Sequence, residues 1–116
     1  MSIHQQDETS RSGPHRRVES ILDKMRIGYE SEYHLPPYWV DIYINEWHIG
    51  IEVDGPNHSP KKDAIRDEIL KERYFLPILR LKSMLSQEEI MTKIEDFIIL
   101  HAHSGSERKH QYLVLL

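Results

Sequence analysis

Three carboxylates stand at alternating positions in two consecutive segments that have the pattern of β-strands. Asp41 lies in the segment 38–44, and Glu52 and Asp54 lie two residues apart in the segment 48–54. If the two strands pair in a suitable register, all three side chains gather on one face. Like charges that face one another across strands are destabilising, and a divalent cation between them removes the conflict. The spacing therefore predicts either a metal site or a solvated acidic face.

The sequence around these acids has the alternation of a β-hairpin. In the segment 38–44, one predicted face consists of Tyr38, Val40, Ile42 and Ile44 and the other of Trp39, Asp41 and Tyr43. In the segment 48–54, one predicted face consists of Ile49, Ile51 and Val53 and the other of Gly50, Glu52 and Asp54. A polar turn near Asn45 joins the segments, so a hairpin is the simplest pairing.

A helix and a strand are predicted before the hairpin. The helix begins at Arg16 and has its C-terminal cap at Gly28. Its apolar stripe consists of Val18, Ile21, Leu22 and Met25. Alternation over 29–35 predicts a strand, which Pro36 and Pro37 end because proline cannot continue a ladder.

Two helices and a strand are predicted after the hairpin. Ser59 is a suitable N-cap for a helix over 60–74, and a buried strand follows over 78–81. Ser86 and Glu89 have the spacing of a capping box at the start of the last helix. The apolar stripe of the first helix consists of Ile65, Ile69 and Leu70, and that of the second of Ile90, Ile94, Phe97 and Ile98.

The order of these elements predicts an α/β sandwich in which helices flank a mixed β-sheet with a central hairpin. The chain has 116 residues, enough for one modest core. We divide it into a flexible N-terminal arm over 1–15, a folded domain over 16–100 and a polar tail over 101–116. The tail has an apolar end over 112–116, which adds an edge strand or binds a partner.

Composition limits the classes of function. The formal net charge is -4, from 15 Lys and Arg against 19 Asp and Glu, which argues against a protein that mainly coats nucleic acid. No apolar run reaches the roughly 18 residues of a membrane helix, so we expect a cytoplasmic protein. The absence of cysteine excludes disulfides and thiolate ligands, so a metal would be held by carboxylates, carbonyls, water or some of the eight histidines. This favours a hard ion such as Mg²⁺, or Mn²⁺.

A longer pattern surrounds the three acids. It consists of Trp39-Val40-Asp41-Ile42-Tyr43, Ile49-Gly50-Ile51-Glu52-Val53-Asp54-Gly55, His58, Asp63, Arg66-Asp67 and Leu70. This pattern resembles the PD-(D/E)XK, or restriction-endonuclease-like, superfamily and in particular its Vsr-like endonuclease branch. The resemblance covers about residues 16 to 100 and implies a restriction-endonuclease-like sandwich with a catalytic hairpin.

The resemblance also implies roles for individual residues. Asp41 matches the central metal ligand and Glu52 the second acid, with the Val53 carbonyl as a further ligand. Glu19 matches an acid that the family carries on its first helix, although an exposed helical glutamate is an equal alternative. His58 falls where Vsr-like relatives have a histidine that serves as general acid or base; a lone loop histidine is otherwise more often incidental.

The chain departs from the superfamily pattern at one position. The lysine that usually follows the second acid by two residues is Asp54 here, which is typical of the branch and leaves the role of that lysine open. Lys62 or Arg66 can supply positive charge to the phosphorane transition state. Arg66 can equally be paired with Asp63 or Asp67 for structural reasons.

Nucleic acid is the partner that these residues imply, and DNA is the first expectation. The basic residues expected to contact it are Arg16, Arg17, Lys61 and Lys62, although a solvated surface explains them equally well. Trp39, Tyr43 and Trp47 are near the hairpin and can stack on bases or pack beneath a helix. A chain of this size has little room for a recognition domain, so specificity would come from a homodimer or a partner protein.

Three hypotheses for function remain. The first is a metal-dependent endonuclease that hydrolyses DNA phosphodiester bonds, by a nick or a double-strand cut, in repair, restriction or a mobile element. The second is a nuclease-fold module that binds nucleic acid or a protein without cutting. The third is an RNA-cutting toxin or decay factor. The sequence does not choose between one metal ion and two.

Overall fold

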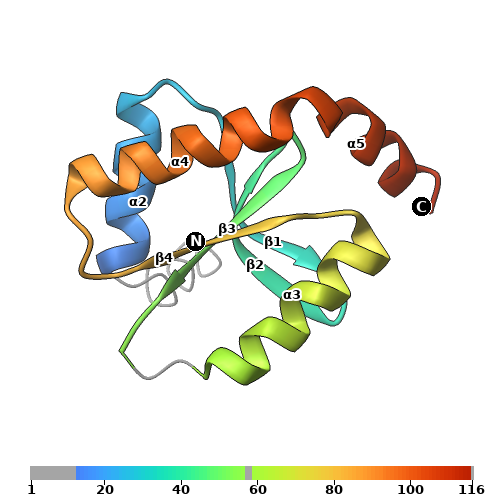
Figure 1. The fold of residues 1–116 in the computed structure, drawn as a ribbon, viewed down its shortest axis with the longest axis horizontal. Coiled ribbons are helices and arrows are strands. Elements are labelled where there is room, and N and C mark those ends of the chain that lie inside the picture. The colour runs from blue at the N-terminus through green and yellow to red at the C-terminus, as the bar shows by residue number, and fades with distance from the viewer. Residues whose placement is uncertain (1–12, 57–58, 116) are drawn as a thin grey trace, which may run out of the picture.

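The computed structural model describes residues 13–56 and 59–115, and its centre is a four-stranded mixed sheet (Figure 1). The strands are β1 (Glu30–Leu35), β2 (Tyr38–Ile44), β3 (Ile49–Asp54) and β4 (Ile78–Lys82), and they lie in this order across the sheet. β1, β2 and β3 pair antiparallel, whereas β3 and β4 pair parallel. The predicted mixed sheet and its hairpin are confirmed.

Helices cover both faces of this sheet. They are α2 (Gly13–Lys24), α3 (Pro60–Tyr74), α4 (Gln87–His101) and α5 (Gly105–Leu113), with a 3₁₀ turn, η1 (Ala102–Ser104), between the last two. Side chains of α2 and α4 pack against one face, and side chains of α3 and α5 pack against the other. Figure 1 shows α4 crossing beside α2, with α3 on the far side of the sheet. The α/β sandwich is therefore confirmed. None of the described helices has both the length and the apolar character that a membrane crossing requires.

The two faces have separate apolar cores. The core under α2 and α4 includes Ile42, Ile44, Ile49 and Ile51. The core under α3 and α5 includes Val40, Tyr43, Leu70, Leu76 and Tyr112. Val40 and Tyr43 therefore lie in the same core, although strict alternation places them on opposite faces. The alternation predicted for β2 is wrong at Asp41. Side chains two residues apart on either side of Asp41 point to opposite faces of the sheet.

The backbone opposite Asp41 explains this change. The β1–β2 register pairs Ser31 with Ile42 and Tyr33 with Val40, which places Glu32 opposite Asp41. Glu32 has a φ of 55°, in the left-handed region that non-glycine residues rarely adopt, and it interrupts the ladder. Asp41 thus sits at an irregularity in the sheet, and its neighbours along the strand follow a new alternation.

The first helix differs from its predicted limits at both ends. It begins at Gly13, so residues 13–15, which the sequence placed in the flexible arm, are helical, and residues 1–12 lie outside the described part. It ends at Lys24, and Arg26 adopts the left-handed conformation with a φ of 61°. The N–H of Ile27 then donates to the carbonyl of Leu22. The predicted cap at Gly28 is wrong, because a hydrogen-bonded Schellman-type turn already ends the helix at Arg26.

The helices after the hairpin follow their capping signals. The Ser59 side chain accepts from the N–H of Lys62, and Ser86 and Glu89 form the predicted capping box. The stripe predicted for α3 is only partly confirmed, because Leu70 is buried but Ile65 is 55% exposed. One face of α3 therefore carries polar side chains against the sheet edge, and these belong to the site described below.

The C-terminal segment was predicted as a polar tail, and it is helical instead. α4 extends to His101 and α5 occupies Gly105–Leu113, with Tyr112 buried in the core under α3 and α5. Arg108 donates to the carbonyls of Trp47 and His48, which fastens α5 to the β2–β3 turn. These main-chain contacts explain why the apolar end of the chain does not form an edge strand.

Candidate active site

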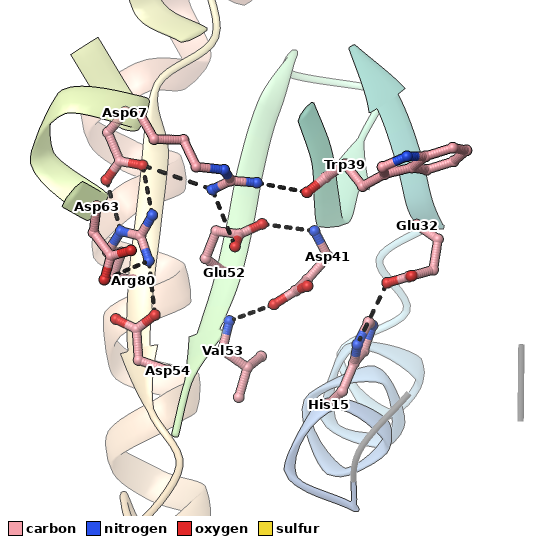
Figure 2. Close-up of polar contacts among 11 residues, drawn as sticks. His15, Glu32, Trp39, Asp41, Glu52, Val53, Asp54, Asp63, Asp67 and Arg80 are labelled. Atoms are coloured by element: carbon pink, nitrogen blue, oxygen red, sulfur yellow. Dashed lines mark hydrogen bonds and ion pairs between the residues drawn. The ribbon is translucent and has the colours of Figure 1, made fainter. Parts of the chain in front are cut away.

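β2 and β3 separate at one end, and carboxylates occupy the fork. The last ladder pair there is Ile42 with Ile51. Beyond it, the N–H of Asp41 donates to Glu52 Oε2 at 2.7 Å, and the N–H of Val53 donates to Asp41 Oδ2 at 2.9 Å (Figure 2). Side-chain oxygens thus replace the main-chain acceptors that a continued ladder would have supplied. The fork fixes Asp41 and Glu52 next to each other.

Glu52 is the most strongly perturbed acid of the fork. Burial, together with the nearby Asp41 carboxylate, raises the pKa of Glu52 to about 7. Arg66, the N–H of Asp41 and Arg80 lower the pKa of Glu52 but do not offset the increase. A carboxyl group poised near neutrality in a cluster of acids is typical of functional sites, although structural networks produce the same effect.

Arg66 reaches the fork from α3. Its Nη1 lies 3.1 Å from Glu52 Oε1, and its Nη2 donates to the carbonyl of Trp39 at 2.5 Å. Asp67 is more distant, at 4.0 Å. The closer ion pair of Arg66 is therefore with Glu52, and the predicted alternative partner Asp67 is at the limit of an ion pair. The guanidinium bridges β2, β3 and α3 at the acidic cluster.

Asp54 belongs to a second network, centred on Arg80 of β4. Arg80 Nη1 lies 2.7 Å from Asp54 Oδ1 and 3.4 Å from Asp63 Oδ2, and the guanidinium makes two further bonds of 2.7 Å to Asp67. Burial lowers the pKa of Arg80, but these carboxylates raise it above its ordinary value. Asp54 is therefore balanced by a cation inside the protein.

A third group of side chains lies on the α2 side of Asp41. His15 Nε2 is 3.1 Å from Glu19 Oε2, and His15 Nδ1 is 3.9 Å from Glu32 Oε2. Glu19 also accepts a hydrogen bond from the hydroxyl of Ser31. Ligand atoms of His15, Glu32 and Asp41 all lie within 4.8 Å of one another. Figure 2 shows Asp41 between Val53 on one side and the pair formed by His15 and Glu32 on the other.

These groups fit a divalent cation better than an anion. Asp41 directs one oxygen to the N–H of Val53, and the imidazole and carboxylate of the α2 side stand near it. Oxygen and imidazole donors suit divalent metals, and no cysteine is present to favour soft ions. A cation held here would neutralise carboxylates that otherwise repel one another across the β1–β2 ladder.

The structure places the predicted site residues unequally. Asp41, Glu52 and Arg66 come together at the fork, Asp54 pairs with Arg80, and Glu19 contacts His15. His58 lies outside the described residues. The basic residues predicted to contact DNA are all exposed: Arg16, Arg17, Lys61 and Lys62.

The aromatic residues near the hairpin have different environments. Trp39 is 56% exposed and stacks on His34, with ring centroids 4.1 Å apart. Tyr43 is buried against Tyr33, which agrees with the alternative that it packs in the core and does not stack on bases. Trp47 is half-buried beside α5. Only Trp39 of the three presents a largely open ring.

Three residues of the site were missed from the sequence, namely His15, Glu32 and Arg80. The i,i+4 spacing of His15 and Glu19 was a signal that both lie on one helix face. Glu32 could have been placed opposite Asp41 by counting back through the hairpin turn at Pro36-Pro37. Arg80 is the only cation inside the otherwise apolar Ile78–Leu81 run, and a charge there implies a buried partner.

The comparisons with known proteins include a match to a solved structure. No protein-family model matches the chain, and no curated protein matches it. A solved structure described as "Homing Endonuclease I-Bth0305I Catalytic Domain" is similar, with a TM-score of 0.63 and 25% sequence identity. The match covers 78% of this chain and 97% of that one. The chain therefore has a nuclease-like fold, and a divalent metal suits its acidic cluster.

Proposed function

We propose that this protein is a divalent-metal-dependent endonuclease that hydrolyses DNA phosphodiester bonds at the β2–β3 fork. The observation that carries the proposal is the position of Asp41. Its carboxylate is fixed by the N–H of Val53 where the sheet opens, next to Glu52 and the half-buried Arg66. The similarity of the whole sandwich to an endonuclease catalytic domain supports the same reaction class.

Asp41 and Glu52 are the side chains that we assign to the metal, with the Val53 carbonyl as a third donor. A bound Mg²⁺ or Mn²⁺ would acidify water and neutralise phosphate charge. In the structure Glu52 is held by Asp41 and Arg66, so this assignment places Arg66 within reach of the same phosphate. Arg66 then has two tasks: it orients Glu52 and supplies positive charge to the transition state.

The roles proposed for the other site residues depend on where they lie relative to the fork. His58 follows the fork after β3 and is assigned to proton transfer, while Asp54 is paired with Arg80 and shapes the electrostatics of the site. Arg16, Arg17, Lys61 and Lys62 are assigned to phosphate contacts, in which they would add salt-dependent affinity. Glu19 acts through His15, which it contacts.

The proposal also covers the branch of the fold, the substrate, the product and the location. We retain the Vsr-like branch on the strength of the hairpin motifs, DNA as the substrate, and nicking as the product of a single chain acting at one site. We also place the activity in the cytoplasm. A homodimer would be needed for a coordinated cut of both strands.

The test is cleavage of supercoiled plasmid by the full chain with Mg²⁺, Mn²⁺ or EDTA. We expect conversion to nicked circles with either ion, no conversion in EDTA, and loss of cleavage in Asp41→Asn and Glu52→Gln. Both variants keep a side-chain oxygen that accepts from the N–H groups of Val53 and Asp41, so they should stay folded. Lys93→Gln, on the exposed face of α4, is the matched control and should cut like wild type.

The rival to this proposal is a nuclease-fold module that binds without cutting. Its expected result is retention of DNA or RNA in EDTA, unchanged by Asp41→Asn, with no cleavage of double-stranded, mismatched or single-stranded substrates under any metal. Cleavage of RNA but not DNA would assign this protein to the RNA-cutting class, with the same metal-dependent chemistry.

A further inference from the structure

The histidine at the start of α2 has a fixed orientation between carboxylates. His15 is 3% exposed, and its Nε2 lies 3.1 Å from Glu19 Oε2. The carboxylate close to Nε2 favours a proton on that nitrogen, and Nδ1 lies on the opposite edge of the ring. A histidine that binds a metal through one nitrogen commonly donates the N–H of the other nitrogen to a carboxylate. Glu19 lies close enough to His15 Nε2 to take this role when a metal is bound.

The other edge of the His15 ring faces a further carboxylate. Nδ1 is 3.9 Å from Glu32 Oε2, and one ligand atom each of His15, Glu32 and Asp41 lies within 4.8 Å of the other two. Ligand atoms around one ion lie at most about 4.4 Å apart when each bond is near 2.2 Å. Only one pair of three donors can span that distance, and three evenly spaced donors lie about 3.8 Å apart, so a contraction of up to about 1 Å would bring all three onto one cation.

The sheet holds the carboxylates of Glu32 and Asp41 near each other, which is electrostatically unfavourable. Glu32 lies opposite Asp41 in the β1–β2 register, and its φ of 55° is an uncommon conformation for a residue with a side chain. Opposed carboxylates at such a position destabilise the hairpin unless a cation lies between them. Either a metal ion or an imidazolium at His15 can be that cation, and the two make different predictions.

We propose that His15, Glu32 and Asp41 form a binding site for a first-row divalent transition ion, with Glu19 as the carboxylate that orients His15. The inference deepens the proposed function, because Asp41 is shared with the fork. It adds two ligands on the α2 side that the hairpin motif does not contain. It differs from the ligand set proposed above in one respect, because Glu52 stays paired with Arg66 and does not bind this ion.

The ligand set implies a preference among ions. An imidazole nitrogen adds little affinity for Mg²⁺, which prefers oxygen ligands and retains water, but it strengthens binding of transition ions. A protein with this site should bind Mn²⁺ more tightly than Mg²⁺, and the difference should depend on His15. A site of oxygen ligands alone, made of Asp41, Glu52 and the Val53 carbonyl, would show no such dependence.

The experiment uses Mn²⁺ alone with the EDTA-treated full chain and needs no DNA. Free Mn²⁺ is counted by its continuous-wave electron paramagnetic resonance signal, and pulsed spectra of the bound ion show whether a ¹⁴N nucleus is coordinated. We expect a ¹⁴N coupling in wild type that is absent in His15→Gln, with Mn²⁺ affinity lower by at least about tenfold. Gln keeps an N–H for Glu19 but offers no imidazole nitrogen.

Further variants separate ligand from orientation. Glu32→Gln should weaken Mn²⁺ binding while the ¹⁴N coupling remains. Glu19→Gln should weaken it by about 10 to 100-fold, as loss of the hydrogen-bond partner of a metal-bound histidine does elsewhere. His34→Gln is the matched control, because His34 lies exposed on the neighbouring strand and stacks on Trp39. It should leave both affinity and coupling unchanged.

Three results would overturn the inference. Bound Mn²⁺ without ¹⁴N coupling would place the ion on oxygen ligands only, and a coupling that survives His15→Gln would assign it to another histidine. No Mn²⁺ binding would leave His15 with a structural role beside Glu19. Plasmid cleavage is scored separately on the same samples. Metal-dependent cleavage together with any of these results would retain the proposed function and reject this site, whereas Mn²⁺ bound through His15 without cleavage would do the reverse.

Discussion

The two ends of the β2–β3 hairpin both bury polar side chains, but they satisfy them in opposite ways. At the turn, His48 is fully buried, its Nε2 donates to the carbonyl of Tyr74 at 2.9 Å, and its Nδ1 accepts from the hydroxyl of Tyr43 at 2.8 Å. A carbonyl can only accept, which fixes the proton on Nε2. Burial, Arg108 and Lys109 lower the pKa of His48, so the ring is neutral at pH 7.

At the fork, the polar groups are charged and unequal in number. Asp41, Glu52 and Asp54 face Arg66 and Arg80, while Glu32, Asp63 and Asp67 add further negative charge. A hydrogen-bonded network around a neutral histidine, such as that at the turn, gives rigidity. An excess of buried and half-buried carboxylates costs stability and gains affinity for cations. The turn is therefore the structural end of the hairpin, and the fork is the functional end.

The largest effect is expected from removal of Arg66, one of the two cations at the fork. Arg66→Ala should reduce the cleavage rate by about 10²- to 10³-fold, the range for loss of one transition-state donor, since it releases Glu52 and removes positive charge from the site. The rate of plasmid nicking under saturating metal measures it. Arg73→Ala, exposed on the same helix, is the control. Equal rates for the two variants would show that the fork is not where cleavage occurs.

Removal of a cation at the turn should lower stability and leave cleavage unchanged. Arg108 donates to the carbonyls of Trp47, His48 and His101, and Arg108→Met leaves these acceptors without it. We expect a loss of about 2 to 3 kcal/mol in unfolding free energy, the cost of unsatisfied buried groups, with an unchanged cleavage rate for folded protein. Urea denaturation measures the loss, and Lys109→Met, whose ammonium makes one exposed contact to Asn45, should change little. A large drop in cleavage by folded Arg108→Met would link the two ends.

The contact of α5 with the turn can be tested by one methyl group. A Cβ at Gly105 would lie 2.8 Å from the carbonyl oxygen of Trp47 and 3.1 Å from its Cα, and a main chain held by Arg108 cannot move away cheaply. Gly105→Ala should cost about 1 to 3 kcal/mol, as overpacking does, despite the better helix propensity of alanine. Gly28→Ala, where a Cβ meets nothing within 4 Å, should be neutral or slightly stabilising. Thermal denaturation of both variants distinguishes these outcomes.

The smallest effect that we predict is a pH dependence from His48. Its pKa in the folded protein lies below the ordinary value of 6.5, so the unfolded chain takes up a proton first as the pH falls. The stabilisation by neutral His48 is complete above about pH 6.5 and declines below it, by at most about 1.4 kcal/mol per pH unit, until the folded pKa is reached. Urea denaturation between pH 7.5 and 5 should show a shallower decline for His48→Gln than for wild type. His34→Gln, at an exposed site, should follow wild type.

Much of the fold could be predicted because its signals are local. Ser59 and the pair Ser86 and Glu89 mark helix starts through bonds that span three residues, and the structure has those bonds. The strands 38–44 and 49–54 follow from a period of two within single segments. The helical tail was missed because the polar residues of 101–111 have no clear period; its position depends on Arg108 meeting carbonyls of the distant turn.

The amino-acid sequence by itself determined the order of the helices and strands as far as α4, the hairpin and the three acids that it carries. Only the tertiary structure decided how those acids are partnered: Glu52 with Arg66, Asp54 with Arg80, and Asp41 beside His15 and Glu32. Caps and alternation depend on neighbours a few residues away, whose separation the covalent chain already limits. Ion pairs and ligand sets depend on distances between α2, α3 and the sheet, which exist only after those layers have packed.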